Sequence, residues 1–262
     1  MGVRLRTRKA VTGLLSVLAA SALGLLGLQT PASAMAGGQP LDWQTQAGGM
    51  VSVINDDPHS GGICSGSLIS TNPSARSTRL VLTAWHCLTD PAGQLVTTPD
   101  ELRVYNGGNQ PGQGTLYGVS QFMRVTIGNQ LTDSVVFQLT QFVNGSLPFP
   151  YDTNTHYGNG TQVRADGYGI TDPSENMSLR QGNFTIINET PATYFNVQGQ
   201  GALTCAGDSG GPVINQNGVI IGTVWTGAAD PAQCSLAWVD VFTPKVSKLE
   251  ASDLNAIVTA LQ

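Results

Sequence analysis

The stretch Thr204-Cys205-Ala206-Gly207-Asp208-Ser209-Gly210-Gly211-Pro212 places the hydroxyl of Ser209, a candidate nucleophile, among small residues. Its glycines let the backbone take sharp, partly left-handed turns that a Cβ would forbid. Such a turn can point the amides of Gly207 and Ser209 at one position, where they would stabilise a tetrahedral oxyanion. Because a serine hydroxyl is a poor nucleophile at neutral pH, the same chemistry needs a base elsewhere in the chain.

Two earlier stretches supply the partners for such a serine. They are Leu82-Thr83-Ala84-Trp85-His86-Cys87 and Thr132-Asp133-Ser134-Val135-Val136. Read in the order His, Asp, Ser, the three stretches resemble the chymotrypsin family of serine proteases, in its secreted, bacterial-type form. The resemblance covers nearly all of the chain after residue 34, and it implies an endopeptidase that forms an acyl-enzyme on Ser209.

The three histidines and the acidic candidates can be separated by their surroundings. His59 and His156 lie in polar turns, whereas His86 follows an apolar run and precedes Cys87, which would hold it rigidly. His86 is therefore the expected general base. Asp133 leads into an apolar strand, and a buried carboxylate there needs a partner such as the imidazole.

The first 34 residues are typical of a secretory signal peptide. A basic start is followed by an apolar run without charge over residues 11–28, and Ala32-Ser33-Ala34 supplies a small-residue cleavage site. Ala34-Met35-Ala36 offers a second site, and a membrane anchor is the alternative for the apolar run. Residues 35–262 are expected to form one secreted protease domain.

Charge limits the partners of the mature chain. The first 34 residues hold four of the 12 Lys and Arg and none of the 17 Asp and Glu, so removing them changes the formal charge from −5 to −9. This excess of acid disfavours nucleic acid and anionic membranes. We expect peptide or protein substrates, protein protease inhibitors as partners, a monomer and no cofactor.

Four cysteines in an exported chain predict two disulfides, for which the sequence allows three pairings. The family resemblance implies Cys64 with Cys87 and Cys205 with Cys234, which would clamp the loops carrying His86 and Ser209. A four-thiolate metal site is the alternative, and the chain has no Cys-x-x-Cys pair to favour it.

Short β-rich runs alternate with Gly, Asn, Pro and Asp turns, which predicts an all-β fold. The expected strands are 50–54, 63–70, 80–83, 102–105, 115–127, 134–139, 162–168, 179–187, 194–197, 212–215, 219–226 and 237–242. Ser252 or Asp253 is expected to cap one C-terminal helix that runs through Leu261. The resemblance makes this fold two six-stranded antiparallel Greek-key barrels with the active site between them.

The resemblance also implies an activation pair and a specificity pocket. Signal cleavage after Ala34 would give Met35 a free amine that pairs with the carboxylate of Asp208. Trp225, between Val224 and Thr226, would lie along the substrate and wall the pocket, Leu203 would lie at its floor, and Thr204 would also take part in substrate binding. Counting back from the stretch at 242–246 puts Asp240 on the opposite wall of the pocket, where it would either receive a Lys or Arg side chain or bond to Thr204.

Two other functions fit parts of the sequence. An inactive homologue could use the same cleft to bind a peptide or protein. An exported esterase would call for Gly-x-Ser-x-Gly at a strand-to-helix turn, whereas Ser209 lies between expected strands.

Overall fold

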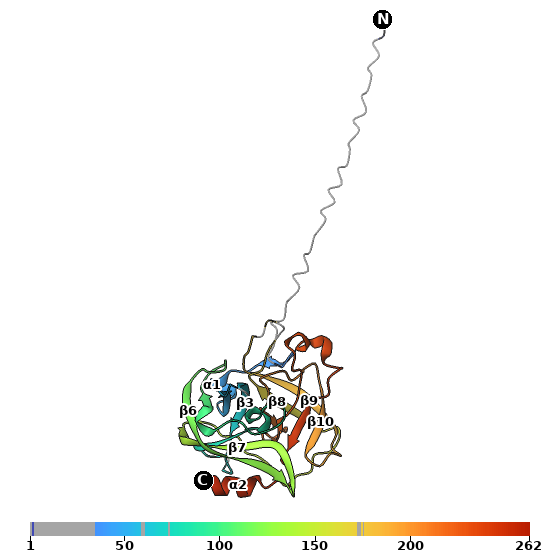
Figure 1. Ribbon diagram of the computed structural model, residues 1–262. Coiled ribbons are helices and arrows are strands. Elements are labelled where there is room, and N and C mark those ends of the chain that lie inside the picture. Colours follow the sequence, from blue (N-terminus) through green and yellow to red (C-terminus); the bar gives the residue numbers. More distant parts are fainter. Residues whose placement is uncertain (1, 3–34, 59–60, 73, 172–173, 175) are drawn as a thin grey trace. The chain divides into compact units, whose positions relative to one another are not determined.

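The computed structural model describes residue 2 and residues 35–58, 61–72, 74–171, 174 and 176–262. The expected signal segment, Gly2 apart, and His59 lie outside the described residues. In the described part of the chain, no helix has both the length and the apolar character needed to cross a membrane. The described residues from Met35 onward form short strands joined by turns (Figure 1).

The first half of the fold is a closed antiparallel barrel with the strand order β2-β3-β4-β7-β6-β5. Alternation of side chains shapes it, since in β5 Leu102 and Val104 point into the core and Arg103 is exposed. Val51, Val81 and Phe137 complete the same core. The strands are β2 (Met50–Asn55), β3 (Gly62–Leu68), β4 (Ser77–Ala84), β5 (Leu102–Asn106), β6 (Thr115–Ile127) and β7 (Gln130–Asn144).

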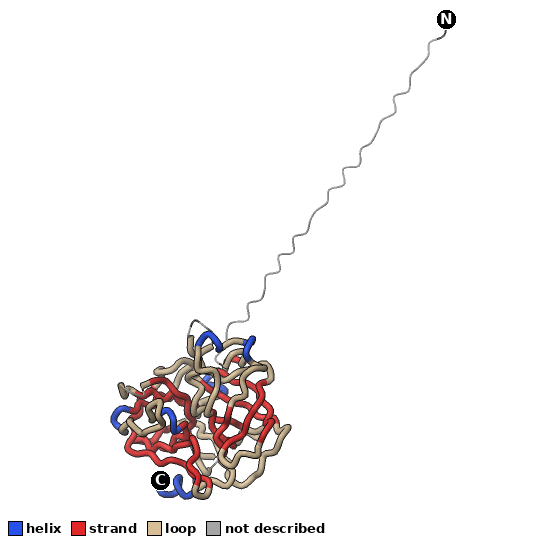
Figure 2. Tube along the Cα trace, turned by 45° about the vertical axis from the view of Figure 1, so that its right-hand side comes forward, coloured by secondary structure: helices blue, strands red, loops and turns tan. Residues whose placement is uncertain are grey.

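The second half is a sheet that closes because β9 pairs with both β10 and β8. Phe184, Phe195 and Ile221 lie in its core. The strands are β8 (Gln162–Gly167), β9 (Arg180–Asn188), β10 (Tyr194–Gly199), β11 (Pro212–Ile214), β12 (Ile220–Val224) and β13 (Lys245–Lys248), and β1 (Gln39–Pro40) adds to the edge of β9. Figure 2 shows the two groups of strands. The expected pair of six-stranded barrels is confirmed.

The C-terminal helix α2 (Leu254–Leu261) is also confirmed and begins after Asp253. Its buried residues, Ile257 among them, pack with Leu82 of the first barrel and Ile220 of the second. The carboxylate of Asp253 accepts hydrogen bonds from the backbone and the hydroxyl of Thr126, both at 2.8 Å, instead of capping the helix. The remaining helices are α1 (Trp43–Gln46) and 3-10 turns at Trp85–Leu88, Pro99–Glu101, Pro231–Gln233 and Leu236–Trp238.

One expected strand is wrong. Residues 237–242 form a 3-10 turn and a following turn, because the amides of Val241 and Phe242 both bond to the carbonyl of Trp238. Neighbouring Trp238 and Val239 both pack into one apolar cluster, where a strand would point them to opposite faces, while Val241 is exposed. The last strand is instead β13, whose lysines lie over aromatic rings: Lys245 over Tyr194 at 4.9 Å and Lys248 over Phe195 at 4.7 Å.

Candidate active site

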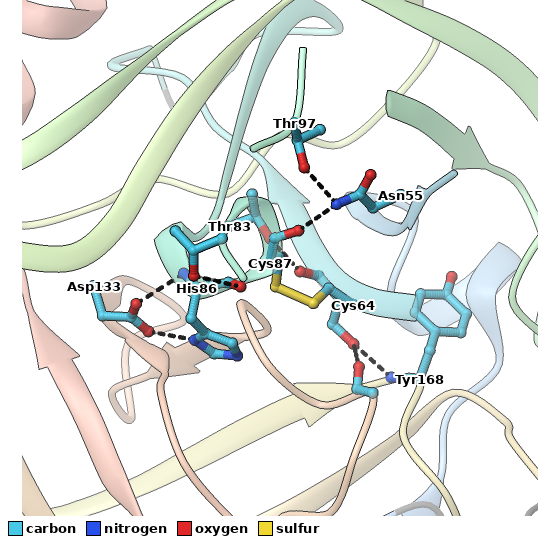
Figure 3. The surroundings of a disulfide bond; sticks show 11 residues. Asn55, Cys64, Thr83, His86, Cys87, Thr97, Asp133 and Tyr168 are labelled. Carbon is cyan, nitrogen blue, oxygen red and sulfur yellow. Dashed lines mark hydrogen bonds and ion pairs between the residues drawn. A yellow bond between two sulfur atoms is a disulfide. The ribbon is translucent and has the colours of Figure 1, made fainter. Parts of the chain in front are cut away.

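His86 and Asp133 form a tight pair. Strand β4 ends at Ala84, and the 3-10 turn that follows points the ring of His86 toward Asp133 in β7. The Nδ1 atom of His86 lies 2.7 Å from Oδ2 of Asp133, and the backbone N–H of His86 donates to Oδ1 at 3.0 Å (Figure 3). The side chain of Asp133 is 5% exposed and that of His86 is 37% exposed. The imidazole is thus fixed on one nitrogen and open on the other side.

A disulfide supports the backbone behind His86. Cys64 in β3 is joined to Cys87, as the resemblance implies, and the bridge lies beside the imidazole (Figure 3). The side-chain amide of Asn55 donates to the carbonyl of Cys87 at 2.8 Å. Cys64, His86 and Cys87 are also a grouping of metal-type ligands in the described chain, but both sulfurs are consumed in the disulfide. The second bridge joins Cys205 to Cys234, so the alternative of a four-thiolate metal site is ruled out.

Ser209 and His86 both line one cavity of about 430 Å³. The loop that carries Ser209 is pressed against the first barrel: the amide of Ser65 donates to the carbonyl of Ser209 at 2.8 Å. A Cβ on Gly210 would overlap the hydroxyl of Thr83 and crowd the amide of Ala84, two residues before His86. Among the described residues the hydroxyl of Ser209 has no hydrogen-bond partner, so it is not bonded to His86, whose ring bonds to Asp133. Catalytic hydrogen bonds are often long or poorly aligned before a substrate binds.

The amides of Gly207 and Ser209 are free, since neither donates a hydrogen bond to another described residue. Gly207 has φ of +95°, a conformation open to glycine. The carbonyl of Ala206 accepts from the amide of Ile170 at 2.8 Å, which turns the N–H of the same peptide, that of Gly207, the opposite way. Free, fixed amides beside a serine are what an oxyanion hole requires.

Ser65, which the sequence did not mark, holds this loop through its side chain. Its buried hydroxyl donates to the carbonyl of Gly207 at 2.7 Å and accepts from the amide of Tyr168 at 2.8 Å. Ser65 thus fixes the carbonyls of both Gly207 and Ser209. No motif in the sequence signals this role, because the residue acts on backbone that only the fold brings near.

Asp208 is fully buried behind the loop. Its carboxylate accepts hydrogen bonds from the amides of Gly169 and Cys205, both at 2.8 Å, and from the backbone N–H of Met35. Burial raises the pKa of Asp208 to about 7, and those three bonds act in the opposite direction. Met35 is itself 0% exposed. The structure therefore brings together the two residues of the expected activation pair.

Comparison with known proteins identifies the lineage of this site. The trypsin family model matches residues 39–246. The chain belongs to the trypsin family. No curated protein matches the chain.

Solved structures similar to this trypsin-family chain include two from the scabies mite. Inactivated protease paralogue S-D1 is 17% identical with a TM-score of 0.66, and the match covers 86% of this chain and 96% of that one. Inactivated protease paralogue S-I1 is 20% identical with a TM-score of 0.63, covering 86% and 98%. Identities this low show a shared fold alone. A bacterial source, expected from the sequence, has no support in these comparisons.

The residues expected at the trypsin-type specificity pocket are only partly gathered at the cleft. Trp225 and Thr226 line it beside Ser209. Leu203, Thr204 and Val224 are buried and lie outside its lining.

Asp240 is not where the sequence count puts it. The residue lies exposed in the turn after the 3-10 helix, and it does not line the cleft. The hydroxyl of Thr204 donates to the carbonyl of Thr226 at 3.0 Å, not to Asp240. The count failed because it treated residues 237–242 as a strand, whereas they form a 3-10 helix and a turn.

His156 forms a surface pair with an acidic residue and has no part in the site. Its Nδ1 lies 2.9 Å from a carboxylate oxygen of Glu250, and the side chain is 63% exposed. This exposed pair does not line the cleft, as expected for a solvated loop histidine.

Proposed function

We propose that this chain is a secreted serine endopeptidase that cleaves peptide bonds through an acyl-enzyme on Ser209. The observation that carries the proposal is the cleft itself, in which Ser209, the Asp133-bound ring of His86 and two free amides meet. Peptides or proteins are the substrates, and no cofactor takes part.

The roles follow from the geometry. His86 accepts the proton of the Ser209 hydroxyl as the oxygen attacks the substrate carbonyl, and the resulting imidazolium is stabilised by Asp133. The amides of Gly207 and Ser209 stabilise the oxyanion, and loss of one such donor typically lowers the rate by about 10²–10³. His86 then gives the proton to the leaving amine, and water hydrolyses the ester by the same steps.

An inactive, peptide-binding homologue is the second candidate. Two observations favour it: the mite proteins of similar fold are described as inactivated, and the hydroxyl of Ser209 is not bonded to His86. Against it, the side chains that the mechanism needs are all present. The hydrogen bond between His86 and Asp133 is also intact in this chain.

Labelling with a small serine-directed phosphonate separates the two candidates. A protease incorporates one label per chain at Ser209 and hydrolyses a casein substrate, whereas Ser209→Ala does neither while keeping its folded circular dichroism spectrum. Ser120→Ala, on the exposed face of β6, is the matched control and keeps both activities. Residual hydrolysis by Ser209→Ala would refute the assignment.

We further propose that export is followed by signal cleavage after Ala34, which frees the amine of Met35 to pair with Asp208. The backbone nitrogen of Met35 already lies within hydrogen-bonding reach of that carboxylate. N-terminal sequencing of the secreted protein tests this directly, and a mature chain that begins at any residue other than Met35 would contradict it.

A further inference from the structure

The two segments that flank the cleft beside Ser209 are joined by hydrogen bonds. The amide of Ala206 donates to the carbonyl of Ala228 at 3.0 Å, and the amide of Ala228 donates to the carbonyl of Thr204 at 2.8 Å. Residues 205 and 228 form a parallel β-bridge, and the hydroxyl of Thr204 reaches the carbonyl of Thr226. Residues 204–206 and 226–228 therefore lie as neighbouring strands.

This spacing leaves no slot between the two segments. Hydrogen-bonded strands lie about 4.7–4.9 Å apart, which is too close for a side chain to enter between their backbones. The two segments are so close at Gly227 that a Cβ there would overlap the carbonyl oxygen of Thr204.

The space beneath the paired segments is filled as well. Leu203 is 0% exposed and packs with Ala36, Ile170 and Val239. The disulfide between Cys205 and Cys234 lies in the same cluster. A long side chain that entered beside Ser209 would have to displace this core.

The cleft above the pair is lined mainly by small and apolar groups. Ala206, Gly227, Ala228 and Ala229 form one side, and Trp225 adds an apolar face. His86 is the one titratable group in the described lining. A Lys, Arg or Glu side chain would lose its hydration there without gaining a partner of opposite charge.

We propose that the cleft accepts only a small side chain, that of Gly, Ala or Ser, at the residue whose carbonyl Ser209 attacks. This inference rests on the proposed function. The specificity-determining elements are Thr204 and the segment 226–228, which close the slot by backbone pairing.

The test compares fluorogenic peptides that differ only at that residue, with Ala, Ser, Leu, Phe, Lys or Glu. We expect kcat/KM for Ala and Ser to exceed that for Leu, Phe, Lys and Glu by at least about 100-fold, the scale on which pockets discriminate by size. Comparable cleavage of the Phe or Lys peptide would overturn the inference, and so would labelling of Ser209 without cleavage of the Ala peptide.

Peptide-binding measurements separate a failure of the small-side-chain pocket from a failure of the proposed protease activity. Absence of phosphonate labelling would count against the proposed protease, whereas the pocket is tested in Ser209→Ala by titrating the Ala and Phe peptides calorimetrically. Tighter binding of the Ala peptide supports the closed slot. Equal binding of the two peptides, or tighter binding of the Phe peptide, overturns it whether or not the chain is catalytic.

Gly227→Ala provides the structural control. Its added methyl must push segment 226–228 away from Thr204, so the ratio of Phe to Ala cleavage, or of Phe to Ala binding, should rise about tenfold or more. Gly158→Ala, where a Cβ meets only ordinary space, should leave both ratios unchanged. Should Gly227→Ala fail to fold, the calorimetric comparison of the Ala and Phe peptides in Ser209→Ala still decides the inference. An unchanged ratio in a folded opening variant overturns the inference.

Discussion

Asp208 makes the stability of the uncleaved chain depend on pH. Burial raises its pKa to about 7 from a usual value of 3.8. Between these values the folded chain holds a proton that the unfolded chain has released, so the free energy of unfolding falls as the pH rises from about 4 to about 7. Urea unfolding of the uncleaved chain at several pH values should show this fall.

A buried carboxyl elsewhere serves as the control for Asp208. Burial raises the pKa of Asp166 to about 6, with Arg164 acting in the opposite direction, so Asp166 adds a fall of the same sign over a narrower range. Asp208→Asn should remove the part of the fall that extends to pH 7, and Asp166→Asn should leave that part in place. A profile unchanged by Asp208→Asn would contradict the assignment.

Asp133 should matter for rate far more than for folding. With asparagine, His86 Nδ1 would face an amide and the ring would lose the carboxylate that stabilises its charged form. In triads of this type that change lowers kcat by about 10⁴. We expect a loss of that size for Asp133→Asn in hydrolysis of the Ala peptide, with KM nearly constant. The exposed change Asp56→Asn should be neutral, and a loss below tenfold for Asp133→Asn would argue against the pair.

At the scale of single residues, the sequence pointed to the candidate catalytic side chains but not to residues that act by bonding to distant backbone. Ser209, His86 and Asp133 stand in motifs that carry their own chemistry. Ser65 acts by bonding to a carbonyl 142 residues away. Asp240 was misplaced because its position was counted along the chain through a segment that turns.

The two disulfides close loops of similar length, one beside His86 and the other beside Ser209. They close separations of 23 and 29 residues, each worth about 3 kcal/mol by the loop-entropy estimate. Replacing either pair by serines should lower the free energy of unfolding by about that amount in urea titrations. Loss of the Cys205–Cys234 bridge should also reduce phosphonate labelling, since that loop carries Ser209 and its free amides. Labelling of the Cys205–Cys234 double variant at the rate of the native chain would show that this bridge does not order the loop.

Strands were predicted where apolar residues alternate or run together, and missed where polar side chains disguise them. β6 was expected at its observed bounds. β13 reads as polar because Lys245 and Lys248 frame it, yet its lysine chains cover aromatic rings while Val246 lies in the core. Residues 237–242 are the opposite case: their apolar character led to a predicted strand, but they form a turn.

At the scale of the molecule, residues from both barrels build the site, and composition could not reveal this. Ser134 of the first barrel bonds through its hydroxyl to Thr223 and Ser247 of the second, at 2.8 Å and 3.0 Å. Asp133 donates its own amide to Ser247. Periodicity alone predicts an all-β chain, and only the family resemblance supplied two barrels with a cleft between them.

The N-terminus bears on the proposed chemistry of Ser209, because Asp208 precedes Ser209 in the chain and holds the amides of Gly169 and Cys205. In a chain that keeps the residues before Met35, Asp208 becomes protonated as the pH falls below about 7. Its hydrogen bonds to the two amides then weaken. In a chain that begins at Met35, the new ammonium group keeps the carboxylate ionised. We therefore compare the phosphonate labelling rate of the mature chain with that of the extended chain. The ratio of the first rate to the second should rise as the pH falls from 8 to 6. In mature and extended forms of Asp208→Asn the ratio should stay flat, and a flat ratio in the native sequence would mean that the terminus does not order the loop.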